Sequence, residues 1–248
     1  MCFAIPNHFC GRCVVGIGHT EPGISGTSDS SDGVRATSTS GNGLSARSSS
    51  STAIFAASAT SNGVSAFGGG DNGVGIFAQA SARRAPPAGK NPVAGSFDGD
   101  VEVTGDIRFI GPGQDCAEDF DVAGLEKIEP GTVMVIDAFG VLRQSERAYD
   151  KRVAGVVSGA GDFRPAIILG TQQAGSNRAP IALLGKVYCK VDAGYSPVEV
   201  GDLLTTSPTP GHAMKADDPL KAFGSVIGKA LRPLLAGQQL VPILIALQ

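Results

Sequence analysis

Two carboxylates in this sequence could perform acid–base chemistry, and both lie in the segment Asp115-Cys116-Ala117-Glu118-Asp119-Phe120. An Asp and a Glu held close together can divide the duties of general acid and general base. Repulsion from the nearby Asp119 and Asp121 would favour the protonated form of one member. Residues three apart on a strand point to opposite faces, so we expect Asp115 and Glu118 to converge only across a turn or with help from a neighbouring chain. The alternative for such an acidic cluster is a solvated surface or a turn cap.

A second group of reactive residues stands near the start of the chain, where Cys2, His8, Cys10 and Cys13 follow the pattern C-x5-H-x-C-x2-C. These residue types bind zinc, but a second well-spaced pair is lacking. Reduced thiols are therefore the alternative to a metal site. The glycine run 68–70 lacks the lysine and the strand–helix frame of a phosphate-binding loop, so we predict no cofactor.

The stretch that must organise the chain is a repeat, because a Gly or Ala followed by an aliphatic residue recurs every ten residues: Gly23-Ile24, Gly33-Val34, Gly43-Leu44, Ala53-Ile54, Gly63-Val64 and Gly73-Val74. A small or apolar residue follows each aliphatic two positions later, which an extended chain places on the same face. Four repeats begin with Asp-Gly or Asn-Gly, dipeptides that turn the chain tightly. Each repeat thus predicts a turn and one short strand with a single apolar face.

Ten residues are too few for one turn of a single-chain β-solenoid, which needs roughly twenty or more. Either two repeats make one coil or three chains each supply one side, and the small second position favours a three-chain β-helix. The alternative is a flexible Ser/Gly/Thr-rich linker. The strict period argues against that linker.

The composition changes along the chain predict five parts. They are an N-terminal segment, 1–22, that need not be ordered; the repeat shaft, 23–80; a linker rich in proline and charge, 81–96; a β neck, 97–114; and an all-β domain, 115–248. In the last part, alternating patterns predict strands over 132–136, 153–157, 166–169, 181–191, 203–206, 226–231 and 240–247. Within 186–191 we expect Val187, Cys189 and Val191 to face inward. The predicted fold is all-β, with a β-helical shaft and a β-barrel or sandwich domain.

The composition narrows the function classes. Of 248 residues, 42% are hydrophobic, which excludes global disorder, while 35 Gly, 15 Pro and no Trp are typical of a turn-rich β protein. A net charge of −3 gives no electrostatic reason to expect nucleic acid or an anionic membrane as a partner. No apolar run is long enough to span a membrane, and the first residues do not resemble a secretory signal. The compartment stays open, a virion or another extracellular particle included.

Four motifs carry a resemblance to a known family: the acidic segment 115–120, Gly155-Val156-Val157-Ser158, residues 181–187, and Gly201-Asp202-Leu203-Leu204-Thr205-Thr206-Ser207-Pro208 with the following Pro210-Gly211-His212-Ala213. Together they resemble the C-terminal intramolecular chaperone domain of phage neck appendages and tail spikes, a family classed as self-cleaving glutamic-type peptidases. The resemblance covers residues 115–248. A shaft of short β repeats before this domain matches the usual layout of the family.

The resemblance implies that three chains align through residues 115–248 and that the shaft then winds into a trimeric β-helix. It also implies a cut just before the acidic motif, at the Gln114–Asp115 bond, with Asp115 and Glu118 as the catalytic pair. Cleaved members carry Ser where this chain has Gln114, so we expect the chain to stay uncut.

Three functions are therefore compared. The first is a structural homotrimer of the fibre or tail-spike kind, whose partners are its own copies and an upstream fibre or baseplate protein. The second is an autoprotease that releases its terminal domain; no enzyme with turnover is expected. The third is an adhesin that binds a cell-surface glycan through Ser25, Arg35, Ser45 and Ser65 of the shaft, ranked lower because the shaft has no Trp or Tyr to stack on sugars.

Overall fold

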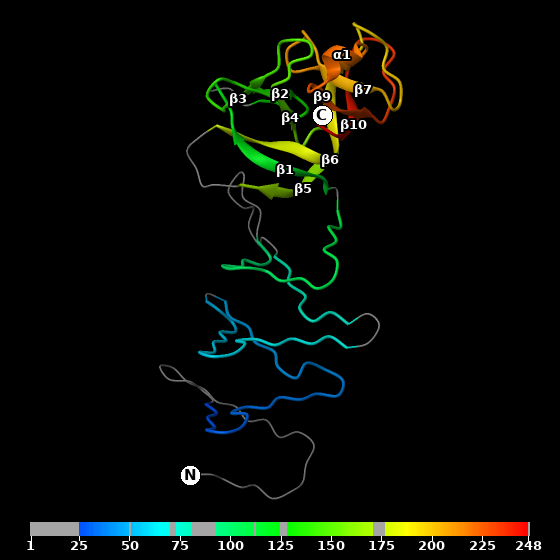
Figure 1. Cartoon of the computed structure of the whole chain (residues 1–248). Coiled ribbons are helices and arrows are strands. Elements are labelled where there is room, and N and C mark those ends of the chain that lie inside the picture. Colours follow the sequence, from blue (N-terminus) through cyan, green and yellow to red (C-terminus); the bar gives the residue numbers. More distant parts are fainter. Residues whose placement is uncertain are drawn as a thin grey trace, which may run out of the picture. The chain divides into compact units, whose positions relative to one another are not determined.

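The computed structural model describes residues 25–49, 51–69, 73–80, 93–111, 113–124, 128–170 and 177–247 (Figure 1). The chain divides into two compact units, Met1–Asp100 and Val101–Gln248. Every regular element of the described residues lies in the second unit. No helix among the described residues is long and apolar enough to cross a membrane.

The ten-residue repeat is visible in the backbone of the first unit. The hydroxyl oxygens of Ser28, Ser38, Ser48 and Ser58 each accept a hydrogen bond from the backbone N–H three residues later, over 2.9–3.1 Å. The chain then folds back on itself, since a Cβ atom added to Gly43 would lie 3.1 Å from the carbonyl oxygen of Ala36. The same approach recurs twenty residues later, between Gly63 and Ala56 at 3.2 Å. The sequence period is therefore also a period of local turns.

The short strands predicted for each repeat are absent from the described residues between 25 and 111, in both the repeats and the neck. The physical reason is that an isolated extended segment has no neighbour to complete its backbone hydrogen bonds. The aliphatic side chains of the repeats also remain 61–70% exposed in one chain: Val34, Leu44, Ile54, Val64 and Val74. The three-chain β-helix stays a prediction.

The second unit confirms the all-β class. Its strands are β1 (Gly113–Asp121), β2 (Val133–Ile136), β3 (Leu142–Gln144), β4 (Val153–Val157), β5 (Arg164–Leu169), β6 (Arg178–Asp192), β7 (Leu203–Thr206), β8 (Ala213–Lys215), β9 (Val226–Ala230) and β10 (Gln238–Ile245). One short helix, α1 (Pro219–Ala222), is capped by the Asp218 carboxylate, which accepts hydrogen bonds from two backbone N–H groups. Strands β6, β8, β7, β9 and β10 pair in that order, and β10 pairs again with β6. These five strands close a barrel. Figure 1 labels β6, β7, β9 and β10 of this barrel.

Strand β6 joins the barrel to a second group of strands because it is 15 residues long. Its C-terminal half pairs with β10, while its N-terminal half lies between β1 and β4. The predicted alternation is confirmed, since Val187, Cys189 and Val191 are fully or almost fully buried in the barrel core. Burial raises the pKa of the Cys189 thiol to about 12, so this cysteine is an inert core residue.

Candidate functional site

The acidic segment forms strand β1, which lies between two partners. Strand β5 pairs with it in parallel and β6 pairs with it antiparallel. The register to β5 shifts on both sides of Asp115, and the register to β6 shifts just after Cys116. Such irregularities re-aim side chains and are frequent next to active sites. The chain is thus regular along most of β1 but distorted at the bond predicted to be cut.

Asp115 is buried, with 4% of its surface exposed. Neither carboxylate oxygen has a hydrogen-bond partner among the described residues, and the same is true of the buried Ser158 hydroxyl. Burial raises the pKa of Asp115, and Ser158 faces the carboxyl closely enough to oppose part of that rise. A carboxyl whose pKa is raised by burial holds its proton more readily than an exposed one, which is a property of general acids.

The Gln114–Asp115 peptide bond packs tightly against β6. Gly185 has φ of +106°, and a Cβ atom there would lie 2.9 Å from the Asp115 Cα and would also collide with the Gln114 carbonyl oxygen. A shallow depression of about 320 Å³ opens at this bond, lined by Gln114 and Asp115 together with Phe109, Ile167 and Leu184. The bond is therefore held rigidly in a strand while it borders open space.

Glu118 does not join Asp115 within one chain. Burial alternates along β1, with Asp115 and Ala117 buried and with Cys116 and Glu118 only half-buried, so the two carboxylates point to opposite faces. The Glu118 Cγ lies beside Gly170, 3.7 Å from where a Cβ of that residue would stand. The catalytic pair stays a prediction that requires a neighbouring chain to bring the second carboxylate.

A partner that the sequence analysis missed is Arg178, which lies 57 residues from Asp121. Its Nη1 donates to the Asp121 carboxylate over 3.0 Å, and its Nη2 donates to the carbonyl oxygen of Asp119. The acidic cluster is therefore partly neutralised from β6. The antiparallel pairing of β1 with β6 brings these residues together, and no local sequence pattern predicts that pairing.

The residues predicted to bind zinc, Cys2, His8, Cys10 and Cys13, lie outside the described residues. Within the described part of the chain, no group of three or more His, Cys, Asp or Glu side chains could hold a metal ion.

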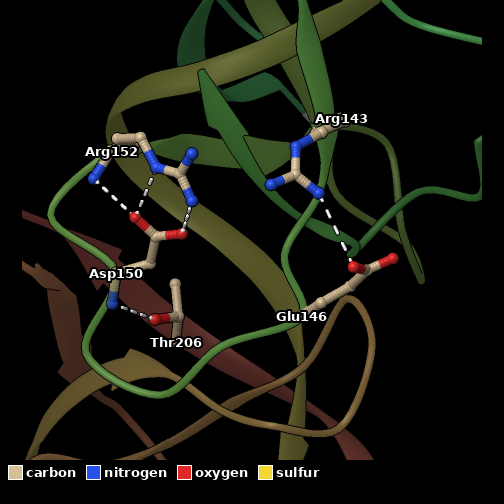
Figure 2. A network of polar contacts seen from close by, with 5 residues as sticks. All are labelled: Arg143, Glu146, Asp150, Arg152 and Thr206. Atoms are coloured by element: carbon tan, nitrogen blue, oxygen red, sulfur yellow. Dashed lines mark hydrogen bonds and ion pairs between the residues drawn. The ribbon is translucent and has the colours of Figure 1, made fainter. Parts of the chain in front are cut away.

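Figure 2 shows a further polar network that the sequence analysis did not find. The Arg152 guanidinium donates two hydrogen bonds to the Asp150 carboxylate, over 2.9 and 2.6 Å. The backbone N–H of Asp150 donates a third, of 2.8 Å, to the Thr206 hydroxyl on β7. The hydrogen bonds from Arg152 hold the pKa of the Asp150 carboxyl below its usual value. Beside it, Arg143 and Glu146 form a looser ion pair of 3.6 Å. The network fixes the loop before β4 against the barrel, so its role is structural.

A second network surrounds Asp192 at the end of β6. Burial disfavours the ionised form of Asp192 and raises its pKa. Hydrogen bonds of 2.7–2.8 Å from Thr209, Gly194 and Gln238 outweigh this effect and hold the pKa of Asp192 below its usual value. His212 adds a favourable charge interaction, while its Nδ1 lies 2.8 Å from the Pro210 carbonyl oxygen. With these bonds satisfied, the cluster stabilises the turn between β7 and β8.

Comparison with solved structures finds similarity to proteins of bacteriophage phi29. No family model matches the chain, and no curated protein matches it. The structure titled pre-mature bacteriophage phi29 gene product 12 is 14% identical with a TM-score of 0.44, over 61% of this chain and 24% of that one. The C-terminal fragment of the same gene product is 15% identical with a TM-score of 0.37, over 53% of this chain and 100% of the fragment.

A third structure, the head fiber gp8.5 N base in bacteriophage phi29, is 20% identical with a TM-score of 0.24, over 53% of this chain and 89% of that one. The chain therefore spans about a quarter of the length of the first of these proteins. With TM-scores below 0.5, these similarities carry no functional argument for this chain.

Proposed function

We propose that this chain is a structural component of a phage fibre or appendage, that it works as a homotrimer, and that residues 115–248 direct its assembly. The observation that carries the proposal is the row of aliphatic side chains, one every ten residues, that stays 61–70% exposed in a single chain. Full burial of one such side chain is worth about 1.5–3 kcal/mol. A regular row of such exposed side chains therefore favours association of this chain with others.

Other copies of the chain are the partner that fits this row. A neighbour must present apolar residues at the same ten-residue spacing to stay in register, and an identical chain does so by construction. The small residues two positions after each aliphatic, such as Ala36, Ala56 and Ala66, allow several backbones to approach closely.

The second unit offers a further surface of the same kind. Strand β5 pairs only with β1 among the described strands, so its other edge is open. Ile167, Ile168 and Leu169 on this edge are 38–49% exposed, and no charged residue interrupts them. Unprotected apolar edges are rare in proteins that act alone.

Native mass spectrometry of the full chain tests the proposal. We expect a species of three times the 25.1 kDa chain mass. A folded monomer at micromolar concentration would overturn the trimer and the reasoning from the exposed row.

A second candidate function is self-cleavage, because Asp115 combines a raised pKa with a position at the distorted Gln114–Asp115 bond. Glu118 of a neighbouring chain would supply the second carboxylate. We expect the wild type to remain uncut, since Gln114 replaces the Ser of cleaved family members. In Gln114→Ser, fragments that meet at this bond would reveal a latent protease, and Gln114→Ser combined with Glu118→Gln should then abolish the cut. An intact Gln114→Ser chain would refute the candidate.

A further inference from the structure

Two shallow depressions lie side by side in the second unit, where the predicted neck runs into β1 and β5. The larger, of about 320 Å³, is the one at the Gln114–Asp115 bond, and the smaller has about 260 Å³. Because Phe109, Gly113 and Ala166 line both depressions, the two form one continuous surface. We call this surface the neck patch and define it by its apolar side chains: Phe109, Ile110, Pro165, Ala166, Ile167 and Leu184.

The neck patch is apolar and open to solvent. Ile110 is 94% exposed, Leu184 is 66% exposed and Phe109 is 55% exposed. Arg164 lies at the edge of the patch, but its guanidinium donates to three backbone carbonyl oxygens of residues 159–163. Contiguous exposed apolar surface marks a site of protein association. The neck patch therefore calls for an apolar partner.

The neck patch carries both halves of a contact. The Ile110 side chain protrudes almost entirely into solvent, and it borders the smaller depression without lining the larger one. The larger depression has more room than a cavity of about 150 Å³ that holds benzene, so one aliphatic side chain fits it. A protrusion and a depression at different places of one surface make a head-to-tail contact, and such contacts can close into a ring of identical copies.

The charges beside the neck patch favour a second copy of this chain as the occupant. Arg108 is exposed and directly precedes Phe109, while Glu118 lies on the same face of β1 as Cys116, which lines the larger depression. Neither Arg108 nor Glu118 forms an ion pair among the described residues. A copy whose Ile110 enters this depression brings its Arg108 toward Glu118. Opposite charges then meet at the rim of an apolar contact, which favours the correct register.

We propose that the neck patch is the contact between copies of this chain in the second unit, with Ile110 of one copy seated in the larger depression of the next. The inference rests on the proposed homotrimer and adds to it the residues through which neighbouring copies recognise each other. The apolar walls of the depression surround the incoming side chain, and Arg108 of the incoming copy pairs with Glu118. Three such contacts close the ring.

Disulfide crosslinking in the full chain tests the contact. In Ile110→Cys, the introduced thiol of one copy should lie beside Cys116 of the next, since Cys116 lines the larger depression. Mild oxidation should therefore give covalent dimers and trimers on a non-reducing gel, and peptide mass mapping should place the disulfide between position 110 and Cys116. Leu220→Cys is the matched control, because Leu220 is 90% exposed but lines neither depression. The same oxidation should give no disulfide between its introduced thiol and Cys116.

Ile110→Ala measures the strength of the contact. Loss of a buried Ile should weaken each of the three contacts by about tenfold or more. The concentration at which half of the trimer dissociates varies as the square root of the dissociation constant, so it should rise by about thirtyfold. Native mass spectrometry over a dilution series measures this rise, and Leu220→Ala should dissociate as the wild type does.

The outcomes separate this contact from the homotrimer itself. A wild-type monomer would overturn the proposed homotrimer and the contact with it. A wild-type trimer would leave the homotrimer standing, and the contact alone would be overturned if Ile110→Cys gave no disulfide to Cys116 or only one within a single chain. Dissociation of Ile110→Ala at the wild-type concentration would also overturn the contact alone.

Discussion

Replacement of Asp115 by Asn is expected to stabilise the folded chain at neutral pH. In the wild type the carboxyl is buried, neither oxygen has a hydrogen-bond partner among the described residues, and burial raises its pKa above the ordinary value of 3.8. An Asn side chain has nearly the same shape, so the substitution leaves no cavity. It carries no charge at any pH, so its burial costs less free energy than burial of the ionised Asp115 carboxylate.

The size of the effect follows from this environment. A buried polar group without a partner costs about 1–3 kcal/mol, and a charged one costs more. The amide remains a buried polar group, so we expect a net gain of about 1–2 kcal/mol at pH 8. For a domain of this size, 1 kcal/mol raises Tm by roughly 3–5 °C. The variant should therefore melt about 3–10 °C above the wild type at pH 8.

The sign of the pH dependence is fixed by linkage. Because the folded pKa of Asp115 is higher than the unfolded one, the folded state binds more protons. The contribution of Asp115 to stability is fully present below about pH 3.8, falls as the pH rises through the folded pKa, and stays low above it. Asn lacks this dependence. The gap between the two Tm values should widen from pH 4 to pH 8.

Thermal melts of both proteins across this range, at equal chain concentration, measure the gap. Parallel curves, or a variant less stable than the wild type at pH 8, would refute the reasoning. Either result would mean that the Asp115 carboxylate is stabilised by a partner that a single chain does not supply.

Three further predictions concern other parts of the chain. Asp150→Asn should destabilise the folded chain by about 1–2 kcal/mol at pH 7, because it weakens the bidentate pair with Arg152. Since the pKa of Asp150 is lowered in the folded chain, this loss should vanish as the pH falls through the folded pKa, and thermal melts at pH 3 and 7 measure the difference. Gly185→Ala should cost at least about 2 kcal/mol in a denaturant titration, since φ is +106° and the Cβ would strike Gln114 and Asp115; an unchanged midpoint would contradict that packing. Val64→Asp should prevent trimer formation, because it places several charges of one sign in one layer of the shaft at a cost of several kcal/mol per ion, whereas the neighbouring Ser65→Asp should keep the trimer in size-exclusion chromatography with light scattering.

The strand ranges predicted from the sequence coincide with β2, β4, β5, β6, β7, β9 and β10 of the second unit, whereas the short strands β3 and β8 were not predicted. In β6, Val187, Cys189 and Val191 occupy the barrel core as the pattern requires. The barrel closure could not be predicted in this way. It depends on the pairing of β10 with β6, whose residues lie more than 40 positions apart and whose register no local pattern specifies.

Strand β1 was harder to predict because its sequence is rich in Asp and Glu, which are rare in strands. The strand forms because β5 and β6 pair with it on both sides, which is a tertiary effect. In the shaft, by contrast, strands predicted from the local pattern are not formed. Its local pattern favours strands, yet a single chain gives those strands no partner, so only the turn part of each repeat is formed.

For Asp115, the proposals of trimer assembly and of self-cleavage both depend on whether a second chain reaches its buried carboxylate. The sequence places Asp115 in an acidic cluster for which a solvated surface was the alternative to a catalytic pair, whereas the fold buries this residue and leaves its oxygens without a hydrogen-bond partner among the described residues. If a second chain brings a donor or a carboxylate to this position, then Asp115→Asn should change both the melting temperature and the trimer's resistance to dissociation. If no chain reaches it, the substitution should raise the melting temperature alone. Native mass spectra of the two proteins, recorded beside their melts, therefore separate an assembly or cleavage site from a buried charge that only limits stability.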